Sequence, residues 1–363
     1  MYSLTHVIFA FPVDMKRTRE AEDQGVVSTK RPKKPEERHR CYALFLGYLG
    51  TGFHGMQKQL DGQGNETVTT IEGVFEKALV ESGWLDPVLL EDGGCLNWSR
   101  SARTDKGVHA VTNVVACNLK EAGEPSEWIS KVNEALTRTS IRVFFAHKVT
   151  ARFDARMQCD RRRYEYLIPF KFPDDSKVRF PANFREQLNA SLSVFVGTHN
   201  FHNFTSGIRS DDPAVNRLIY SAGIHPVVGY EDSHVKMVIE GQSFLLNQIR
   251  KIVASVIEVL LGLVDVDELK SYLTPSARRN LRMAPGEGLL LDRLHYDGYD
   301  KFKCNYKDIL PIEWSIKENK DVVDEFKQNV IYPEVTRSLP VIFEKWVTES
   351  FLNNYSKNFS DEN

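Results

Sequence analysis

Hydrophobic residues follow strand or helix spacing through most of the chain between residue 41 and about residue 300. Alternation and β-branched residues predict strands, and apolar residues three or four apart predict helices. The predicted strands are Cys41–Tyr48, Val108–Leu119, Ile141–His147, Arg163–Ile168, His234–Glu240 and Gly288–Tyr296. The predicted helices are Thr70–Val80, Pro125–Leu136, Phe184–Val196 and Phe244–Leu261, with two more near Val322–Asn329 and Val341–Phe351. Because strands and helices are mixed without a strict βαβ rhythm, the pattern predicts an α+β fold.

The first 40 residues differ in character from the rest of the chain. From residue 14 they are mostly polar, with basic groups at Lys16–Arg17 and Lys30–Lys34. Such a segment buries too little apolar surface to offset the entropy of ordering, so we predict a disordered tail over residues 1–40. The two spaced basic groups favour a nuclear-import signal, and the alternative is a tail that only improves solubility. We expect the protein in the nucleus, with the mitochondrion as a second compartment.

Composition limits the class of protein without choosing a function. The 363 residues are 42% hydrophobic and 26% charged, with a formal net charge of −2, values typical of an ordinary globular protein. A near-neutral total gives no support to nucleic-acid binding, so that prediction depends on where the charges lie. Five cysteines without CxxC spacing argue against a disulfide framework or a zinc site. No apolar run is long enough to span a membrane, and we expect no membrane partner.

A crowded charged run is the first candidate for chemistry. Arg100, Arg103 and Lys106 surround Asp105 in the sequence, and Gly107 follows. Cations around a carboxylate favour its ionised form, which a nucleophile needs, and glycine lets the backbone approach closely. The alternative is a surface turn with solvated salt bridges, which composition alone favours.

The second candidate is a strand that begins with three arginines. Arg161, Arg162 and Arg163 precede Tyr164 and Tyr166, which share one face by alternation. Guanidinium groups suit phosphates and an aromatic ring suits an unstacked base, so the pattern is typical of an RNA-contacting strand. An edge strand with solvated arginines and core tyrosines is the equal alternative.

The third candidate lies in the predicted long helix. Leu245, Ile249, Ile252 and Val256 form an apolar stripe, and Arg250 lies beside it. An arginine at a core boundary needs an anionic partner, unless it extends along the surface into water.

A fourth segment, Gly197–Gly207, contains two histidines. His199 and His202 are three residues apart, but no third ligand lies nearby in the sequence. We therefore predict no metal site there and expect Phe201 and Phe204 to pack in the core.

Taken in order, these segments resemble the TruA family of tRNA pseudouridine synthases, over Cys41 to about Tyr296. The most specific stretch is the Arg-Thr-Asp-x-Gly-Val-His pattern around Asp105, and the run in Gly197–Gly207 is similar to the eukaryotic nuclear branch. One departure is Asn133–Arg142, which lacks the proline that the family usually has before Ile-Arg, so the geometry of that loop is in doubt. The matching segments are Tyr48–Gln57, Arg103–His109, Arg163–Tyr166, Asn247–Val253 and Ala284–Leu289.

The resemblance implies a role for each of four residues. A uridine must leave the RNA stack before its glycosidic bond can react. By analogy with the family, Asp105 is the nucleophilic carboxylate or abstracts a sugar proton. Arg103 holds the space left by the flipped base, Tyr164 stacks on that base, and Arg250 pairs with Asp105. No cofactor and no metal are implied, since the reaction is an isomerisation.

The resemblance also implies the partner and the architecture. We expect tRNA as substrate, with small nuclear and messenger RNAs as further candidates, and a monomer. Two ferredoxin-like halves, 41–170 and 171–300, are expected to join their sheets around a catalytic cleft, followed by a helical extension over 301–363. The predicted RNA-binding residues are Arg100, Lys106, His109, Arg161, Arg162, Arg163, His202 and Lys251.

Two rival functions remain open at this point. An RNA-binding protein that has lost catalysis would be expected to lack the carboxylate, and this chain has Asp105. A metal-dependent nucleic-acid hydrolase would need clustered carboxylates or histidines near the basic cleft, and no such cluster is seen in the sequence.

Overall fold

The computed structural model describes residues 38–91, 97–121, 123–303 and 309–353. The described residues all belong to one compact unit, and its mixture of strands and helices confirms the α+β class. The predicted N-terminal tail lies outside the described residues, apart from residues 38–40 at the start of the first strand.

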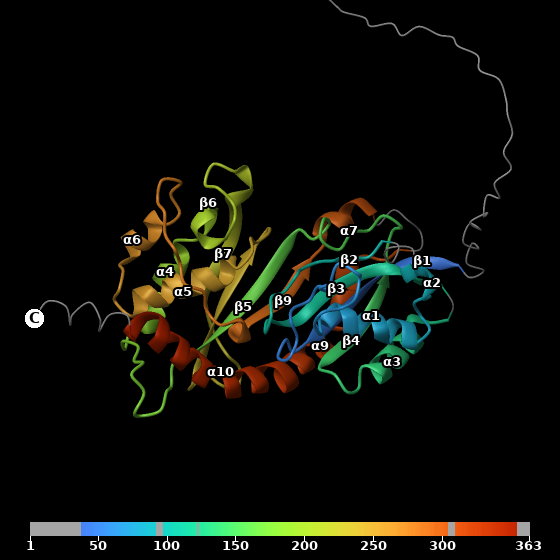
Figure 1. The fold of residues 1–363 in the computed structure, drawn as a ribbon, viewed down its shortest axis with the longest axis horizontal. Coiled ribbons are helices and arrows are strands. Elements are labelled where there is room, and N and C mark those ends of the chain that lie inside the picture. Colours follow the sequence, from blue (N-terminus) through green and yellow to red (C-terminus); the bar gives the residue numbers. More distant parts are fainter. Residues whose placement is uncertain (1–37, 92–96, 122, 304–308, 354–363) are drawn as a thin grey trace, which may run out of the picture. The chain divides into compact units, whose positions relative to one another are not determined.

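One mixed sheet of nine strands forms the centre of the described residues (Figure 1). Eight strands follow the order β4-β1-β3-β9-β5-β8-β7-β6, and β2 pairs with β3. Their bounds are β1 His39–Tyr48, β2 Ser99–Arg100, β3 His109–Lys120, β4 Ile141–Lys148, β5 Arg161–Pro169, β6 Gly197–Asn200, β7 Asn216–Pro226, β8 His234–Gly241 and β9 Leu289–His295.

The middle of the sheet is a short parallel joint. Strands β3 and β9 pair in parallel at only two positions, His109 with Leu290 and Ala110 with Leu291, whereas the other neighbouring strands pair antiparallel. The sheet therefore has two antiparallel parts joined at the start of β3, directly after the Asp105 run. This joined sheet agrees with the sequence prediction, while the ferredoxin-like topology of each half stays a prediction. Strand β5 precedes the expected boundary at residue 170 but pairs with β8 and β9.

Helices lie against both parts of the sheet. Helix α3 contacts β4, and α4 contacts β7, while α9 contacts β3 and α10 contacts β5. The C-terminal helices therefore connect the two parts of the sheet, as Figure 1 shows along one side of the molecule. The helix bounds are α1 Ile71–Glu81, α2 Val88–Glu91, α3 Pro125–Ala135, α4 Phe184–Ser193, α5 Gln248–Leu260, α6 Val266–Ser271, α7 Asp297–Lys303, α8 Ile312–Glu318, α9 Lys320–Phe326 and α10 Tyr332–Val347.

Local sequence signals explain several of these boundaries. Thr70 caps α1 by accepting a hydrogen bond from Gly73 N, and Pro125 occupies the first turn of α3. The prediction of a helix from Phe244 is wrong, because α5 begins at Gln248 after Asn247 adopts a φ of 63°. A left-handed residue interrupts the helical path, so residues 243–247 form a loop instead.

A buried cluster of charges attaches the C-terminal helices to the sheet. Glu165 of β5 is fully buried, and it accepts hydrogen bonds from Lys236 Nζ, Lys327 Nζ and Tyr332 Oη at 2.7–2.9 Å. Lys327 also pairs with Asp292 of β9. Burial alone would raise the pKa of Glu165, but Lys327 and Lys236 hold it well below its ordinary value. Lys327 thus joins the adjacent strands β5 and β9 through one side chain.

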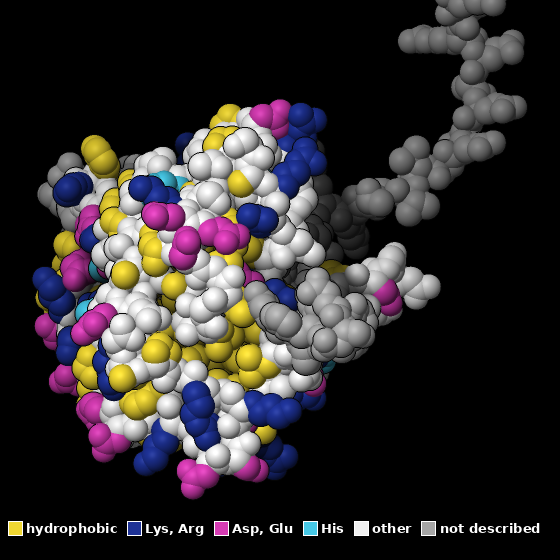
Figure 2. Space-filling model, turned by 90° about the vertical axis from the view of Figure 1, so that its left-hand side faces the viewer, with side chains coloured by type: hydrophobic (Ala, Val, Ile, Leu, Met, Phe, Trp, Pro, Cys, Tyr) yellow, Lys and Arg dark blue, Asp and Glu magenta, His cyan; other side chains and the backbone are white. Residues whose placement is uncertain are grey.

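One face of the molecule carries charges of both signs. Figure 2 shows acidic and basic side chains mixed on one end of the molecule, in keeping with the formal net charge of −2. No helix among the described residues has the length and apolar character needed to cross a membrane.

Candidate active site

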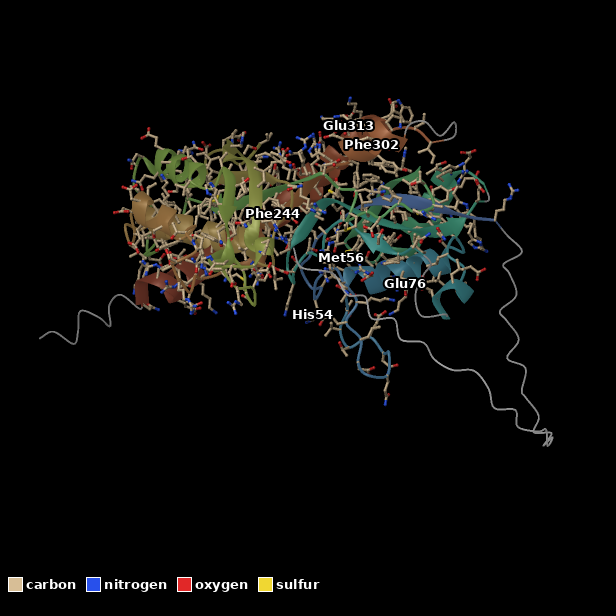
Figure 3. The ribbon with its side chains drawn as sticks, turned by 90° about the horizontal axis from the view of Figure 1, so that it is seen from above. His54, Met56, Glu76, Phe244, Phe302 and Glu313 are labelled. Carbon is tan, nitrogen blue, oxygen red and sulfur yellow. The ribbon has the colours of Figure 1, made fainter. Side chains whose placement is uncertain are left out.

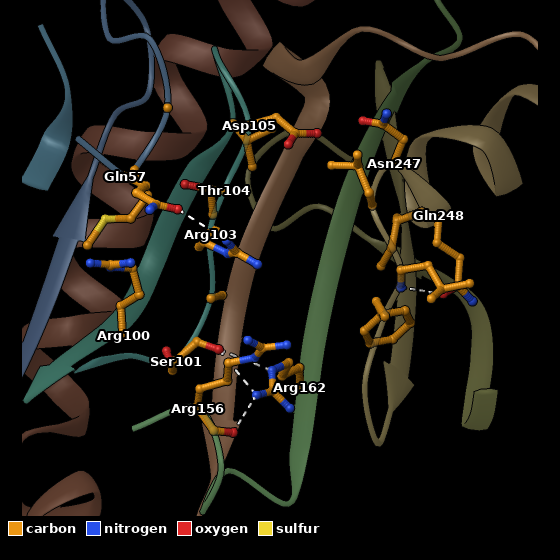
Figure 4. Close-up of a pocket in the computed structure, with 18 of the residues that line it drawn as sticks. Gln57, Arg100, Ser101, Arg103, Thr104, Asp105, Arg156, Arg162, Asn247 and Gln248 are labelled. Carbon is orange, nitrogen blue, oxygen red and sulfur yellow. Dashed lines mark hydrogen bonds between the residues drawn. The ribbon is translucent and has the colours of Figure 1, made fainter. Parts of the chain in front are cut away.

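A cleft of about 1010 Å³ brings together three of the four segments that the sequence singled out. One wall is the Asp105 loop, the floor includes Arg162 and Tyr164 of β5, and the other wall is the loop before α5. Figure 4 shows Asp105 and Asn247 on opposite sides of this cleft. Figure 3 shows Phe244 on one side and His54 and Met56 on the other.

The loop that carries Asp105 is held by polar contacts on both sides. Thr104 Oγ1 is 2.7 Å from the buried Tyr48 Oη, and Thr104 O accepts a hydrogen bond from Met56 N at 3.0 Å. Asn113 of β3 donates to Ala102 O at 3.1 Å and to Tyr48 Oη at 3.0 Å. Because Tyr48 and Asn113 belong to core strands and Met56 is buried, the carboxylate is positioned before any ligand binds.

The turn after Asp105 requires glycine. Gly107 has a φ of 80°, a conformation that residues with a Cβ rarely adopt. Its neighbour Val108 is so close to Gly50 that a Cβ on Gly50 would lie 2.1 Å from Val108 O. The glycines of the two sequence motifs therefore let the Asp105 loop pack tightly against the end of β1.

Asp105 and Arg250 form the ion pair that the resemblance implied. Arg250 Nη1 lies 3.5 Å from Asp105 Oδ2, and Arg250 Nε donates to Ala284 O at 2.7 Å. The Arg250 side chain is 14% exposed and that of Asp105 is 29% exposed. Arg250 is thus fixed to the segment before β9, while the carboxylate keeps an open side toward the cleft.

Tyr164 lies in the same cleft with its ring against Phe244. The two ring centroids are 5.2 Å apart in an edge-to-face arrangement. Burial raises the pKa of Tyr164 well above its ordinary value, so its hydroxyl keeps its proton at neutral pH. The ring can offer an apolar face to a base, and the hydroxyl can donate a hydrogen bond.

The arginines of β5 divide between the two faces of the sheet. Arg162 is 8% exposed and donates to four backbone carbonyls, those of Ser101, Cys159, Arg156 and Gln242. It therefore joins the Asp105 loop to β5 and β8 and has little capacity left for a phosphate. Contact of the three arginines with RNA stays a prediction.

The other two arginines of β5 do not line the cleft. Arg161 pairs with Glu240 and Asp297, and Arg163 pairs with Asp292 and Glu165. Alternation along a strand places both on the face opposite to Tyr164. The sequence could not separate these roles, because three adjacent arginines look equivalent until the neighbouring strands are known.

The three cations around Asp105 in the sequence differ in their surroundings. Arg100 lines the cleft but its guanidinium donates to the buried carboxylate of Glu72. Arg103 is exposed and donates only to Gln57 Oε1, at 3.2 Å, among the contacts of the described residues. Lys106 is exposed outside the lining of the cleft. Of the three, only Arg103 both lines the cleft and has, within the described residues, no ion pair that a ligand would have to break.

His109 is buried beside the cleft, and its contact with RNA stays a prediction. The ring is 1% exposed, its Nδ1 accepts from Gly50 N, and its Nε2 lies 3.1 Å from Glu287 O. Burial lowers the pKa of His109 to about 4. A neutral imidazole with both nitrogens occupied connects the first motif to the closing motif.

This histidine gives the fold a defined sensitivity to acid. In the unfolded chain the imidazole has a pKa near 6.5 and takes up a proton below that pH, whereas the folded protein does not until about pH 4. The free energy of unfolding should therefore fall as the pH is lowered from 6.5 to 4, by about 3 kcal/mol from this residue in total. Urea unfolding at pH 7 and pH 5 measures the change, and His109→Gln should show a smaller one. An equal change in both proteins would contradict this account.

His202 and Lys251 lie in a separate, smaller pocket. Lys251 Nζ donates to Asn203 O and Thr205 O, and the His202 nitrogens contact Asn200 Oδ1 and Ala277 O. Phe201 and Phe204 are fully buried, as expected. In the described part of the chain, no group of three or more His, Cys, Asp or Glu side chains could hold a metal ion.

Several residues lining the cleft escaped the sequence analysis. These residues are His54, Arg217, Phe244 and Leu246. Arg217 lies in no sequence motif, His54 lies in the Tyr48–Gln57 segment without a role assigned to it, and the other two come from the loop that was predicted as helix.

Comparisons with known proteins point to one family. A family model described as tRNA pseudouridine synthase matches residues 192–297. The human "Pseudouridylate synthase 1 homolog" is 34% identical over 326 residues, which cover 86% of this chain and 73% of that protein. Its mouse counterpart is 31% identical over 353 residues, covering 94% and 79%. The "tRNA pseudouridine synthase 1" of Candida glabrata is 28% identical over 392 residues, covering 84% and 69%.

Similarity of this extent defines the class of protein as an isomerase, a pseudouridine synthase. The chain belongs to the tRNA pseudouridine synthase family, which confirms the resemblance that the motifs indicated.

Proposed function

We propose that this protein converts specific uridines of tRNA to pseudouridine, with Asp105 as the nucleophilic carboxylate. The observation that carries the proposal is the position of Asp105, which lies beside Arg250 in a cleft whose floor includes Tyr164. Relatives named as tRNA pseudouridine synthases support tRNA as the substrate.

The reaction is balanced within one nucleotide. The bond between C1′ of the ribose and N1 of uracil breaks, the uracil rotates, and a new bond forms between C1′ and C5. C5 loses its proton and N1 gains one, so no oxidant or reductant is needed. Asp105 either attacks C1′ or removes a proton from the sugar, and in both roles the Arg250 guanidinium lies beside its carboxylate.

The target uridine must leave the stack to reach Asp105. Base flipping costs a few kcal/mol, which contacts to the flipped base and to the gap must offset. Tyr164 is placed to stack on the base, and the exposed Arg103 is placed to fill the gap. The loop residues opposite Asp105 close the other side of the cleft.

The proposal is tested by mixing the purified full-length chain with an unmodified tRNA transcript and mapping pseudouridine by chemical sequencing. New pseudouridine at defined positions is expected. A chain that binds tRNA but forms none would favour the rival function of an RNA-binding protein without catalysis.

Replacing Arg103 separates catalysis from folding. Since its guanidinium contacts only Gln57 within the described residues, Arg103→Ala should change the free energy of unfolding by less than about 0.5 kcal/mol. Loss of the residue that offsets base flipping should lower kcat/KM by about 10- to 100-fold. Pseudouridine kinetics and urea unfolding of the same preparation provide the two numbers. Parallel losses of activity and stability would instead indicate a structural role.

We extend the proposal to the setting of the enzyme. The basic groups in residues 16–34 support import into the nucleus, with a mitochondrial pool as a second location. We propose that the enzyme acts as a monomer and that small nuclear and messenger RNAs are further substrates. Pseudouridine mapping of fractionated RNA from cells with and without the protein tests the substrates, and light scattering tests the oligomeric state.

A further inference from the structure

Arg217 lies in the active-site cleft but outside every motif that the sequence singled out. It is the second residue of strand β7, where it pairs with His199 of β6. The next residue, Leu218, accepts a hydrogen bond from Gln242 N at 3.0 Å, just before the loop that lines the cleft. Arg217 therefore contributes to the same cleft as Asp105, from the second part of the sheet.

The guanidinium of Arg217 has few partners in the protein. Its Nη1 donates to the adjacent Asn216 O at 2.8 Å, and its Nε is buried without a hydrogen-bond partner. Burial lowers the pKa of Arg217, and the negative charge of Asp212 only partly opposes that effect. Arginine stays protonated at any physiological pH, so this charge is kept in the wall of the cleft at a cost in free energy.

Three other arginines of the cleft, each buried or half-buried, are committed to the protein itself. Arg100 pairs with Glu72, Arg250 pairs with Asp105, and Arg162 donates to backbone carbonyls. Within the described residues no ion pair includes Arg217. A half-buried cation that lacks an acid inside the protein is suited to an anion supplied from outside.

We propose that Arg217 binds a backbone phosphate of the RNA, in a nucleotide that flanks the target uridine. This inference rests on the proposed function and adds a phosphate subsite to it. The planar guanidinium presents donors in a fork that matches two phosphate oxygens, and desolvation strengthens such a contact.

The sheet register separates Arg217 from strand β5, which carries Tyr164 at the proposed position of the reacting base. Arg162 of β5 and Ile219 of β7 both lie opposite Gly241 of β8, so β7 is two strands away from β5. At about 4.8 Å per strand, that separation is about 10 Å. Arg217 is two residues further along β7, and an anion held there belongs to a neighbouring nucleotide.

The test compares Arg217→Met with Arg337→Met in the full-length chain. Arg337 lies on α10, which covers the Glu165 face of the sheet, and its side chain is 77% exposed and paired with Glu334. The Arg217 variant should bind unmodified tRNA about tenfold or more weakly. The slope of log K against log salt should become shallower by about one, while the control matches the original protein.

Phosphate-ethylation interference supplies a readout that a structural role would not change. With the original protein, ethylation of one phosphate near the target uridine should block binding. With Arg217→Met, ethylation of that phosphate should no longer matter, while the other interfering positions remain. Arg217→Gln carries the same comparison if the methionine variant does not fold, because glutamine retains donors for Asn216 O.

The two hypotheses fail in different ways. If the original protein makes pseudouridine but both Arg217 variants keep its affinity, salt slope and interference pattern, the phosphate subsite is wrong and the proposed function stands. If the original protein makes no pseudouridine on tRNA, the proposed function itself is wrong.

Discussion

Asp105→Asn and Asp105→Ala should abolish pseudouridine formation while tRNA binding survives. Asparagine keeps the shape of the side chain but removes the charge that faces Arg250 at 3.5 Å, and it cannot act as the nucleophile. Loss of such a residue lowers kcat by at least about 10³-fold in enzymes that use one reacting side chain. Single-turnover pseudouridine assays measure the rate, and filter binding measures the affinity for tRNA.

Asp154→Asn is the matched control, because Asp154 lines the same cleft. Its Oδ1 accepts hydrogen bonds from Arg156 N and Met157 N at 2.8 Å, which an asparagine oxygen can also accept. This variant should stay active within a few-fold of the original protein. Normal turnover in Asp105→Ala would show that Asp105 is not the nucleophile. Loss of tRNA binding in that variant would instead indicate that Asp105 contributes to binding.

Lys327→Met should cause the largest loss of stability among single replacements in the buried charge cluster. The lysine neutralises Glu165 and Asp292, whose side chains are 0% and 8% exposed. Removing one partner from a buried ion pair leaves a desolvated charge and costs about 3–5 kcal/mol. Urea unfolding at pH 7 should show a loss near the lower end of that range, since Lys236 and Arg163 remain beside Glu165.

Lys320→Met controls for the loss of a lysine from the same helical region. Lys320 is more than half exposed and pairs with Asp324 four residues later, so its removal should cost less than about 0.5 kcal/mol. Equal unfolding free energies for the Lys327 and Lys320 variants would show that the cluster contributes nothing to the attachment of the C-terminal helices.

The sequence predicted those elements whose signals are local. Strand β1 and helix α3 begin within two residues of their predicted starts, because a continuous run of mostly apolar residues marks the first and a proline in the first turn marks the second. Strand β7 was missed, since the run from Asn216 to Pro226 is mostly half-buried or exposed and has no clean alternation. The start of α5 was placed four residues early, because the apolar residues Phe244–Leu246 line the cleft instead of forming a helical stripe.

The candidate site was predicted in part for the same physical reason. Asp105, Tyr164 and Arg250 belong to distinct sequence patterns, and the fold brings all three into one cleft. The partner of each arginine depends on strand pairing, which one sequence does not display. Arg162 therefore looked like a phosphate ligand but joins backbone segments, and Arg217 carried no signal at all.

Strand β5 has a length that cannot change by one residue. Tyr164 points into the cleft and the adjacent Glu165 points into the buried charge cluster, and successive residues of a strand face opposite ways. Deleting one residue from the start of the strand would turn a carboxylate toward the RNA and a tyrosine toward Lys327. In genetic terms, we expect an in-frame loss of one codon here to be more damaging than most substitutions. The same alternation of residues along β5 directs Tyr164 into the cleft and Glu165 into the charge cluster.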